Sequence, residues 1–164
     1  MKNYKKIINN LYLGDYSSIP NSCEFVLSVA SELFLQKTAN LKLKNNDIYF
    51  SFDNQKLFLN LLDYPEIGNI DEDTLKIGLK FIDDCLKKNK NLYVHCIWGV
   101  NRSPSIVFIY LVITKNLKYN NFADAWKQFK KIYWKSNPNP AYWHYLNNQF
   151  PYNDLNWNNT IEEK

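Results

Sequence analysis

Arginine is almost absent from this chain: of its 20 basic residues, 19 are lysine and one is arginine, Arg102. Lysine suffices for ordinary surface charge, whereas the planar guanidinium of arginine can hold a phosphate or carboxylate through two parallel hydrogen bonds. Arg102 is therefore a candidate anion-binding residue. The net charge of +4 is modest and the lysines are spread along the chain. This distribution favours a solvated surface over a nucleic-acid-binding patch.

Long apolar runs and an even cysteine count are also missing. The chain has no run of 18 apolar residues, which argues against a membrane span. Its first residues, MKNYKKIINNLYLG, contain no long apolar stretch, so a secretory signal is not expected. The three cysteines, Cys23, Cys85 and Cys96, indicate reduced thiols instead of a disulfide framework. We expect a cytoplasmic location, with the nucleus as an alternative.

Length and composition predict one packed domain. The chain has 164 residues, 46% of them hydrophobic, which suits a single domain over residues 1–151. We expect residues 152–164, rich in asparagine, to form a loose tail. Residues 4–10 could pack on the chain's own core or on a neighbouring molecule.

Apolar patterns predict an α/β fold. Short apolar runs bounded by turn residues predict strands at 11–13, 24–30 and 92–96, and one or two more within 48–62. Helical periodicity begins at residue 71, and we expect helices over 71–88, 103–115, 122–133 and 141–150. This alternation predicts a mostly parallel, twisted sheet of about four to five strands with helices on both faces.

The segment with the most specific chemistry is HCIWGVNRS, from His95 to Ser103. A strand leads into a tight loop that opens a helix, so backbone N–H groups and the positive helix end converge on an anion site. Cys96 begins the loop, where that field stabilises a thiolate. Arg102 can reach back to a phosphate above the sulfur. Gly99 allows a positive φ or a close backbone approach, and Ser103 can hydrogen-bond the sulfur.

The alternative is that Cys96 is a buried strand-end thiol and Arg102 a surface residue. With three cysteines and one arginine, a Cys-x5-Arg spacing arises at random in about 2% of sequences. The flanking histidine, glycine and serine lower that frequency further. The pattern therefore favours a thiolate that attacks a bound phosphate.

The segment from His95 to Ser103 resembles the H-C-x2-G-x2-R-S loop of protein tyrosine phosphatases, specifically the small dual-specificity phosphatases. Three further segments are similar to that family: residues 11–14 to its first strand, 62–65 to its general-acid loop, and 136–139 to a late Pro-Asn segment. The resemblance extends from about residue 4 to residue 150. It implies the protein tyrosine phosphatase-like fold and no metal or other cofactor.

The resemblance also implies roles for individual residues. Cys96 would attack the phosphorus, Asp63 would protonate the leaving oxygen, and Ser103 would ease departure of the sulfur. Arg102 and the N–H groups of the loop would bind the phosphate; the loop residues are Ile97, Trp98, Gly99, Val100 and Asn101. Asn139 would brace the loop by hydrogen bonds. His95 would tune the thiolate from within the loop or act only structurally.

Four other carboxylates are alternatives for the general acid: Asp53, Glu66, Asp71 and Asp73. Asp63 is preferred because it ends an apolar run that can place it at the functional edge of the sheet, and because it matches the acid loop of the family.

Two loop residues depart from the family pattern. Asn101 stands where dual-specificity phosphatases usually have a smaller residue. An Asn-Arg pair is familiar from the branch that removes 5′ phosphates from RNA, although that branch continues with Thr-Gly and this chain with Ser103 and Pro104. Trp98 is bulky and could form a pocket wall or a stacking surface.

The function expected from these features is hydrolysis of phosphotyrosine, and of phosphoserine and phosphothreonine, on a phosphorylated protein partner. The alternatives are an RNA 5′-phosphatase, a phosphoinositide phosphatase and a catalytically dead phosphate-binding module. Nucleic acid is the less favoured partner because the chain lacks a basic stripe interleaved with aromatic residues. The dead module is disfavoured because Cys96, Arg102 and Asp63 are all present.

Overall fold

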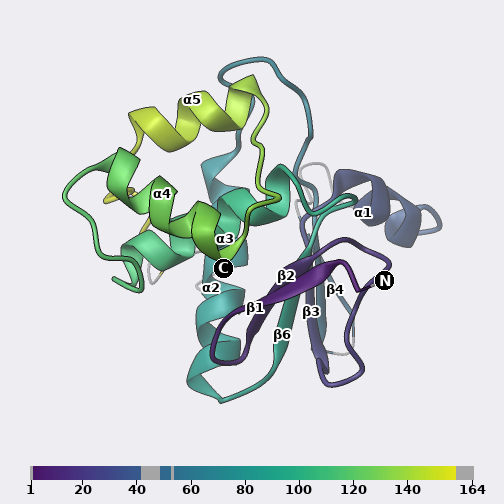
Figure 1. Ribbon diagram of the computed structural model, residues 1–164. Helices are drawn as coiled ribbons and strands as arrows, with labels where there is room; N and C mark the ends of the chain where they lie inside the picture. Colours follow the sequence, from purple (N-terminus) through teal and green to yellow (C-terminus); the bar gives the residue numbers. More distant parts are fainter. Residues whose placement is uncertain (1, 42–48, 53, 158–164) are drawn as a thin grey trace.

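A single six-stranded sheet forms the centre of the molecule in a computed structural model that describes residues 2–41, 49–52 and 54–157 (Figure 1). The strand order is β1-β2-β6-β3-β5-β4. The strands are β1 (Tyr4–Ile8), β2 (Leu11–Gly14), β3 (Phe25–Ser28), β4 (Tyr49–Phe52), β5 (Lys56–Leu59) and β6 (Leu92–His95). The four central strands run parallel, and β1 and β4 are antiparallel edge strands.

The sheet has six strands, one more than the upper end of the prediction, because β1 was not among the predicted strands, whereas β4 and β5 both fall within the predicted range 48–62. The sequence did not decide whether residues 4–10 pack on the chain's own core or on a neighbouring molecule. In the structure β1 pairs with β2 of its own chain, with Tyr4 opposite Gly14. At the other edge, β4 pairs with β5. The predicted mostly parallel α/β sheet is confirmed.

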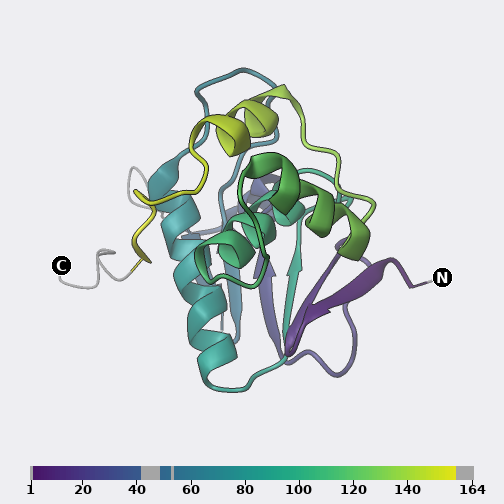
Figure 2. The same cartoon turned by 60° about the vertical axis from the view of Figure 1, so that its left-hand side comes forward.

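Five helices in the described part of the chain cover the sheet. They are α1 (Ser31–Thr38), α2 (Glu72–Lys87), α3 (Arg102–Ile113), α4 (Phe122–Ile132) and α5 (Pro140–Asn148). Helices α2 to α5 gather on one side of the sheet in Figures 1 and 2. Helix α1 covers the other face: Leu59 lies beside Gly78 of α2, whereas the adjacent Phe58 lies under Lys37 of α1. Side chains alternate along a strand, so these neighbours mark opposite faces.

Helix α1 was not predicted, whereas α2 to α5 were. Helix α1 has only eight residues and buries Ser31, Phe34 and Thr38, which is too little to produce a recognisable apolar stripe. Helix α3 is the opposite case, because its residues from Arg102 to Val112 are all buried. A helix that is apolar all round lies in the core, and α3 lies between the sheet and the outer helices.

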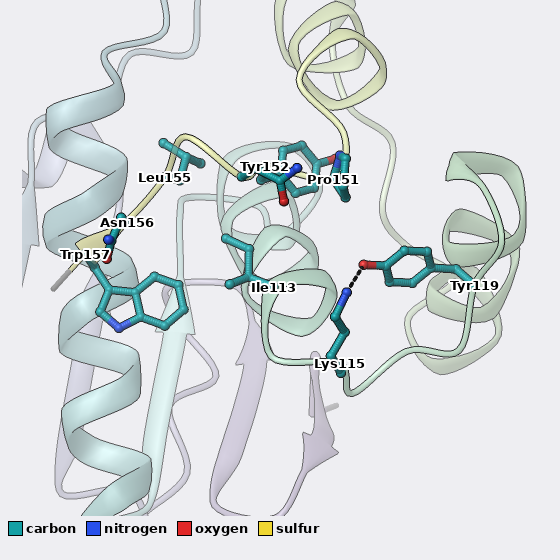
Figure 3. A pocket seen from close by; sticks show the side chains of 9 residues that line it. Ile113, Lys115, Tyr119, Pro151, Tyr152, Leu155, Asn156 and Trp157 are labelled. Carbon is teal, nitrogen blue, oxygen red and sulfur yellow. Dashed lines mark hydrogen bonds between the residues drawn. The ribbon is translucent and has the colours of Figure 1, made fainter.

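The structure differs from the prediction of a loose tail from residue 152. Tyr152, Leu155 and Trp157 are buried, and Trp157 stacks on Tyr110 with 5.8 Å between ring centroids. Figure 3 shows these three side chains around a cavity of about 290 Å³ beside Ile113, at the end of α3. The sequence did not predict this packing, because polar residues separate the three apolar side chains and no periodic pattern results. Residues 158–164 lie outside the described part of the chain.

Across the described ranges, no helix is both long and apolar enough to span a membrane. The cysteines Cys23, Cys85 and Cys96 are all free and buried.

Candidate active site

The carboxyl ends of three neighbouring parallel strands meet at one edge of the sheet, and each is followed by a candidate site residue. Cys96 follows β6, Glu32 lies just beyond β3, and Asp63 lies beyond β5. Two connecting segments complete the site: the phosphate loop, residues 96–101, and the acid loop, residues 60–71. The phosphate loop leads directly into α3, whose first residue is Arg102.

Cys96 is almost completely buried at the start of the phosphate loop, with 3% of its surface exposed. The Ser103 hydroxyl donates a hydrogen bond to its sulfur at 3.2 Å. Both residues sit at the N-terminal end of α3, where the helix dipole favours negative charge. The arrangement suits a thiolate sulfur.

The carbonyl groups of the phosphate loop are held outward by three donors from other segments. The hydrogen bonds are Tyr16 N–H to Ile97 O at 3.1 Å, Tyr133 O–H to Gly99 O at 2.7 Å and Asn137 N–H to Val100 O at 2.8 Å. Within a peptide unit the N–H group points opposite to the C=O group. The N–H groups of Trp98, Val100 and Asn101, which share peptide units with these carbonyls, therefore point to the opposite side, as the anion site predicted from the sequence requires.

Gly99 meets both requirements expected of it. Its φ is +69°, and a Cβ atom there would lie 2.7 Å from the carbonyl carbon of Gly14. Gly14, at the end of β2, is itself packed so closely that a Cβ would lie 2.4 Å from the hydroxyl of Tyr93. Two glycines facing each other thus allow the phosphate loop to rest directly on the end of β2.

Arg102 is held by a carboxylate that sequence reasoning missed, Glu32. Its Nη1 donates to Glu32 Oε2 at 2.7 Å and to Leu61 O at 3.0 Å, and its Nη2 donates to Glu32 Oε1 at 3.1 Å. Its Nε is buried and has no hydrogen-bond partner in the described part of the protein. The two-pronged contact with Glu32 fixes the plane of the guanidinium and leaves Nε as a donor for a bound anion.

The charge on Arg102 survives its burial. Burial acts to lower the pKa of Arg102, but the hydrogen bond that it donates to Glu32 and the negative charges of Cys96 and Asp63 raise the pKa above its ordinary value. Burial likewise acts to raise the pKa of Glu32, but the hydrogen bond from Arg102, a backbone hydrogen bond and the charge of Arg102 together lower the pKa below its ordinary value, so the carboxyl stays ionised. Arg102 and Glu32 therefore form an ion pair in which both side chains are charged.

Asp63, on the acid loop, lines the same cavity as Cys96. Its Oδ1 accepts a hydrogen bond from Asn101 Nδ2 at 2.5 Å, and its Oδ2 lies 3.7 Å from Arg102 Nη2. The acid loop is fastened by Asn139, whose Nδ2 donates to Tyr64 O at 3.3 Å, and by Tyr142, whose hydroxyl donates to Leu62 O at 2.9 Å.

A cavity of about 320 Å³ joins these groups. Its lining residues are Asp63, Pro65, Cys96, Trp98, Val100, Asn101, Arg102 and Asn139. Trp98 forms part of the wall and keeps 75% of its surface exposed.

Three of the other acid candidates, Glu66, Asp71 and Asp73, are not among the described residues that line the cavity with Cys96. Asp71 caps helix α2, accepting hydrogen bonds from Asp73 N–H and the Thr74 hydroxyl. Glu66 is exposed, and it does not line the cavity as described. Asp53 lies outside the described residues.

His95 is buried beneath the loop, with 3% of its surface exposed. Its Nδ1 lies 2.8 Å from Cys96 O, and because a carbonyl only accepts, Nδ1 carries the proton. Burial lowers the pKa of His95, and this outweighs the opposing effects of the Cys96 hydrogen bond and the Asp15 charge. The ring is therefore neutral at physiological pH and holds the start of the loop.

Two of the residues that build the site had little or no signal in the sequence. Glu32 could have been found, because it comes soon after an apolar strand that ends at the same sheet edge as Cys96. Tyr133 could not, because 34 residues separate it from the Gly99 carbonyl that it binds.

The family model for the dual specificity phosphatase catalytic domain matches residues 11–150. The chain belongs to this family. The predicted resemblance to small dual-specificity phosphatases is thereby confirmed, and the match covers both the phosphate loop and the acid loop.

Individual relatives agree with this assignment. The chain is 26% identical over 110 residues to Dual specificity protein phosphatase H1 of Variola virus, which covers 65% of this chain and 57% of the viral protein. It is 29% identical over 132 residues to Dual specificity protein phosphatase 9 of Homo sapiens, which covers 76% of this chain and 31% of the human protein. The chain thus spans only part of the length of these relatives.

Solved structures share the fold. The crystal structure of DUSP15 aligns over 100% of both chains with a TM-score of 0.69 and 19% identity. The human tyrosine phosphatase-like serine/threonine/tyrosine-interacting protein aligns over 89% of this chain and 94% of its own, with a TM-score of 0.63 and 23% identity.

Proposed function

We propose that this phosphatase-family chain hydrolyses phosphotyrosine, and phosphoserine and phosphothreonine, on proteins through a phosphocysteine intermediate. The observation that carries the proposal is the position of the Cys96 sulfur. It lies at the base of a loop whose N–H groups point away from the anchored carbonyls, with the Ser103 hydroxyl 3.2 Å away. The buried Nε of Arg102 remains as a donor for the phosphate.

In the first step, the Cys96 thiolate attacks the phosphorus in line with the ester oxygen. The S–P bond forms, the P–O ester bond breaks, and the leaving oxygen takes the proton of Asp63. The N–H groups of residues 97–101 and Arg102 bind the equatorial oxygens of the transition state, where charge stabilisation supplies much of the catalysis.

In the second step, Asp63 acts as a carboxylate and takes a proton from water. The water oxygen bonds to phosphorus, the S–P bond breaks, and inorganic phosphate leaves. The sulfur departs as a thiolate, which the hydroxyl of Ser103 stabilises. His95 and Asn139 support the two steps by holding the phosphate loop and the acid loop.

A phosphoprotein substrate is supported by the names of the relatives, which are dual specificity protein phosphatases. The cavity agrees, because Pro65, Trp98 and Val100 give it apolar walls that suit a tyrosine ring or the stem of a threonine. Asn101 had suggested an RNA 5′-phosphatase. Here both ends of its amide are engaged, by Asp63 and by Asn139, so its presence requires no RNA substrate.

The test is a comparison of kcat/KM for a phosphotyrosine peptide, a phosphothreonine peptide and a 5′-triphosphorylated RNA. Cys96→Ser should lower turnover of the peptides by at least about a thousandfold, because the hydroxyl is a far weaker nucleophile. Cys85→Ala is the matched control: burial raises the pKa of Cys85 to about 12, and this thiol lies on α2 away from the cavity.

Cys85→Ala should keep the wild-type turnover of folded protein. RNA hydrolysis faster than peptide hydrolysis would replace the proposed substrate class. Peptide turnover that persists in Cys96→Ser would remove the thiolate mechanism.

A further inference from the structure

The side chain of Asn101 lies at a helix start yet does not cap the helix. Asn101 is the N-cap residue of α3, a position where asparagine usually accepts a hydrogen bond from an N–H group of the first turn. Its side chain makes no such bond. The residue is nevertheless 91% buried, with 9% of its surface exposed, so its amide must find other partners.

Both ends of the amide are bound across the active site. The Oδ1 atom accepts a hydrogen bond from the backbone N–H of Asn139 at 2.9 Å, and Nδ2 donates to Asp63 Oδ1 at 2.5 Å. A backbone N–H can only donate, and an ionised carboxylate can only accept, so the two partners set the orientation of the amide. Asn101 thereby joins the phosphate loop, the acid loop and the start of α5.

This contact gives the two oxygens of Asp63 different surroundings. Oδ1 is occupied by Asn101, whereas Oδ2 lies 3.7 Å from Arg102 Nη2 and so faces the phosphate site. The Asp63 side chain is 41% exposed. A general acid must present its proton to the leaving oxygen within hydrogen-bond reach.

We propose that Asn101 is the positioning residue for the general acid: it holds Oδ1 of Asp63 so that Oδ2 carries the proton toward the leaving group. The inference rests on the proposed function. During the first step the Asp63 Oδ2–H bond breaks and the leaving oxygen gains the proton, while the hydrogen bond from Asn101 to Oδ1 persists.

The test compares esters that need a general acid with esters that do not. The phosphothreonine peptide has a poor alkoxide leaving group, and 4-nitrophenyl phosphate has a good one. For Asn101→Ala, kcat on the peptide should fall by about 10–100-fold, a part of the 10²–10⁴ that general acids supply. On the aryl ester kcat should fall by at least about tenfold less than on the peptide, because its leaving group needs little help from a general acid.

Two further variants separate positioning from structural support. The isosteric Asn101→Asp keeps an oxygen for the N–H of Asn139 but, when ionised, cannot donate to Asp63. We expect it to lose as much activity on the peptide as Asn101→Ala. Asn91→Ala is the matched control, because Asn91 Nδ2 also bonds a distant carbonyl, that of Ser22, but at the other end of β6. It should match the wild type on both esters.

A double variant tests whether Asn101 acts through Asp63. Adding Asn101→Ala to Asp63→Asn should lower kcat no further, since the positioned acid is already gone. Equal losses on both esters, an additive double variant or a fully active Asn101→Asp would each overturn the positioning role while leaving the thiolate mechanism intact. A wild-type protein that turned over neither ester would overturn both proposals.

Discussion

The phosphate loop and the acid loop face each other across one cavity but are built in different ways. The phosphate loop is buried at its two ends, where Cys96 is 3% and Asn101 is 9% exposed, and the backbone carbonyls of the loop are bonded to other segments. The acid loop is open, with the Asp63 side chain 41% exposed and Ile67 62% exposed. Asp63 reaches the site through side-chain hydrogen bonds from other segments.

This difference separates two kinds of catalytic contribution. In the proposed mechanism the phosphate loop binds groups that every phosphate ester shares, so loss of its phosphate contacts should affect all substrates alike. The acid loop would serve the leaving group, which differs between esters, so loss of the acid should depend on the substrate. Four substitutions test this division.

The largest effect is expected for Arg102→Lys, on the phosphate-loop side. An ammonium group cannot bind both Glu32 oxygens and also present a second planar donor to the phosphate. We expect kcat/KM to fall by about 100–1,000-fold on phosphotyrosine and phosphothreonine peptides alike. Thermal unfolding of the variant serves as the folding control, and a loss confined to one peptide would break the comparison.

Asp63→Asn should have the next largest effect, and only on poor leaving groups. The amide has no proton to give, so kcat on the phosphothreonine peptide should fall by about 100-fold or more. Turnover of 4-nitrophenyl phosphate should change by no more than a few-fold. If both esters slowed equally, the general acid would have to be another residue.

A smaller effect is expected for Tyr133→Phe, which removes the hydroxyl bonded to Gly99 O at 2.7 Å. Losing this bond should lower the free energy of unfolding by about 1 kcal/mol. The Ki of inorganic phosphate should rise by about fivefold, which corresponds to about 1 kcal/mol. Tyr119→Phe is the control, because its hydroxyl accepts an exposed bond from Lys115. An unchanged Ki in Tyr133→Phe would show that the loop keeps its shape without this anchor.

Trp98→Ala should have the smallest effect, and Trp98 is an exception to the rule that the phosphate loop affects all substrates alike. Trp98 belongs to the phosphate loop but is 75% exposed and lines the cavity, so it should act on substrates selectively. We expect kcat/KM to fall by about threefold for the phosphotyrosine peptide, as suits a lost aromatic contact, and less for phosphothreonine. Trp134→Ala removes another tryptophan, 71% exposed, that does not line the described cavity. Equal losses in both variants would indicate a general surface effect.

Local patterns in the sequence predicted much of this molecule. The apolar stripe and acidic first turn of α2 predicted that helix, and an apolar run directly after the Cys-x5-Arg segment predicted α3. The phosphate loop was predictable because all of its residues are contiguous. A strand, a glycine and a helix start within nine residues leave few ways to arrange the backbone.

Elements that depend on distant partners escaped prediction. Helix α1 is too short for a periodic signal, and the segment 152–157 hides its three apolar anchors among polar residues. Glu32 lies 70 positions from the arginine that it holds. In each case the stabilising partner belongs to another part of the chain.

The sequence by itself therefore determined the fold class and the phosphate loop, because these depend on local spacing. Only the tertiary structure decided how the residues of the site are oriented: that Glu32 clamps Arg102, that Tyr133 holds Gly99, and that Asn101 binds Asp63 instead of capping its own helix. Hydrogen-bond partners of buried polar groups are chosen by what packing brings within about 3 Å, and spacing along the chain does not encode that choice.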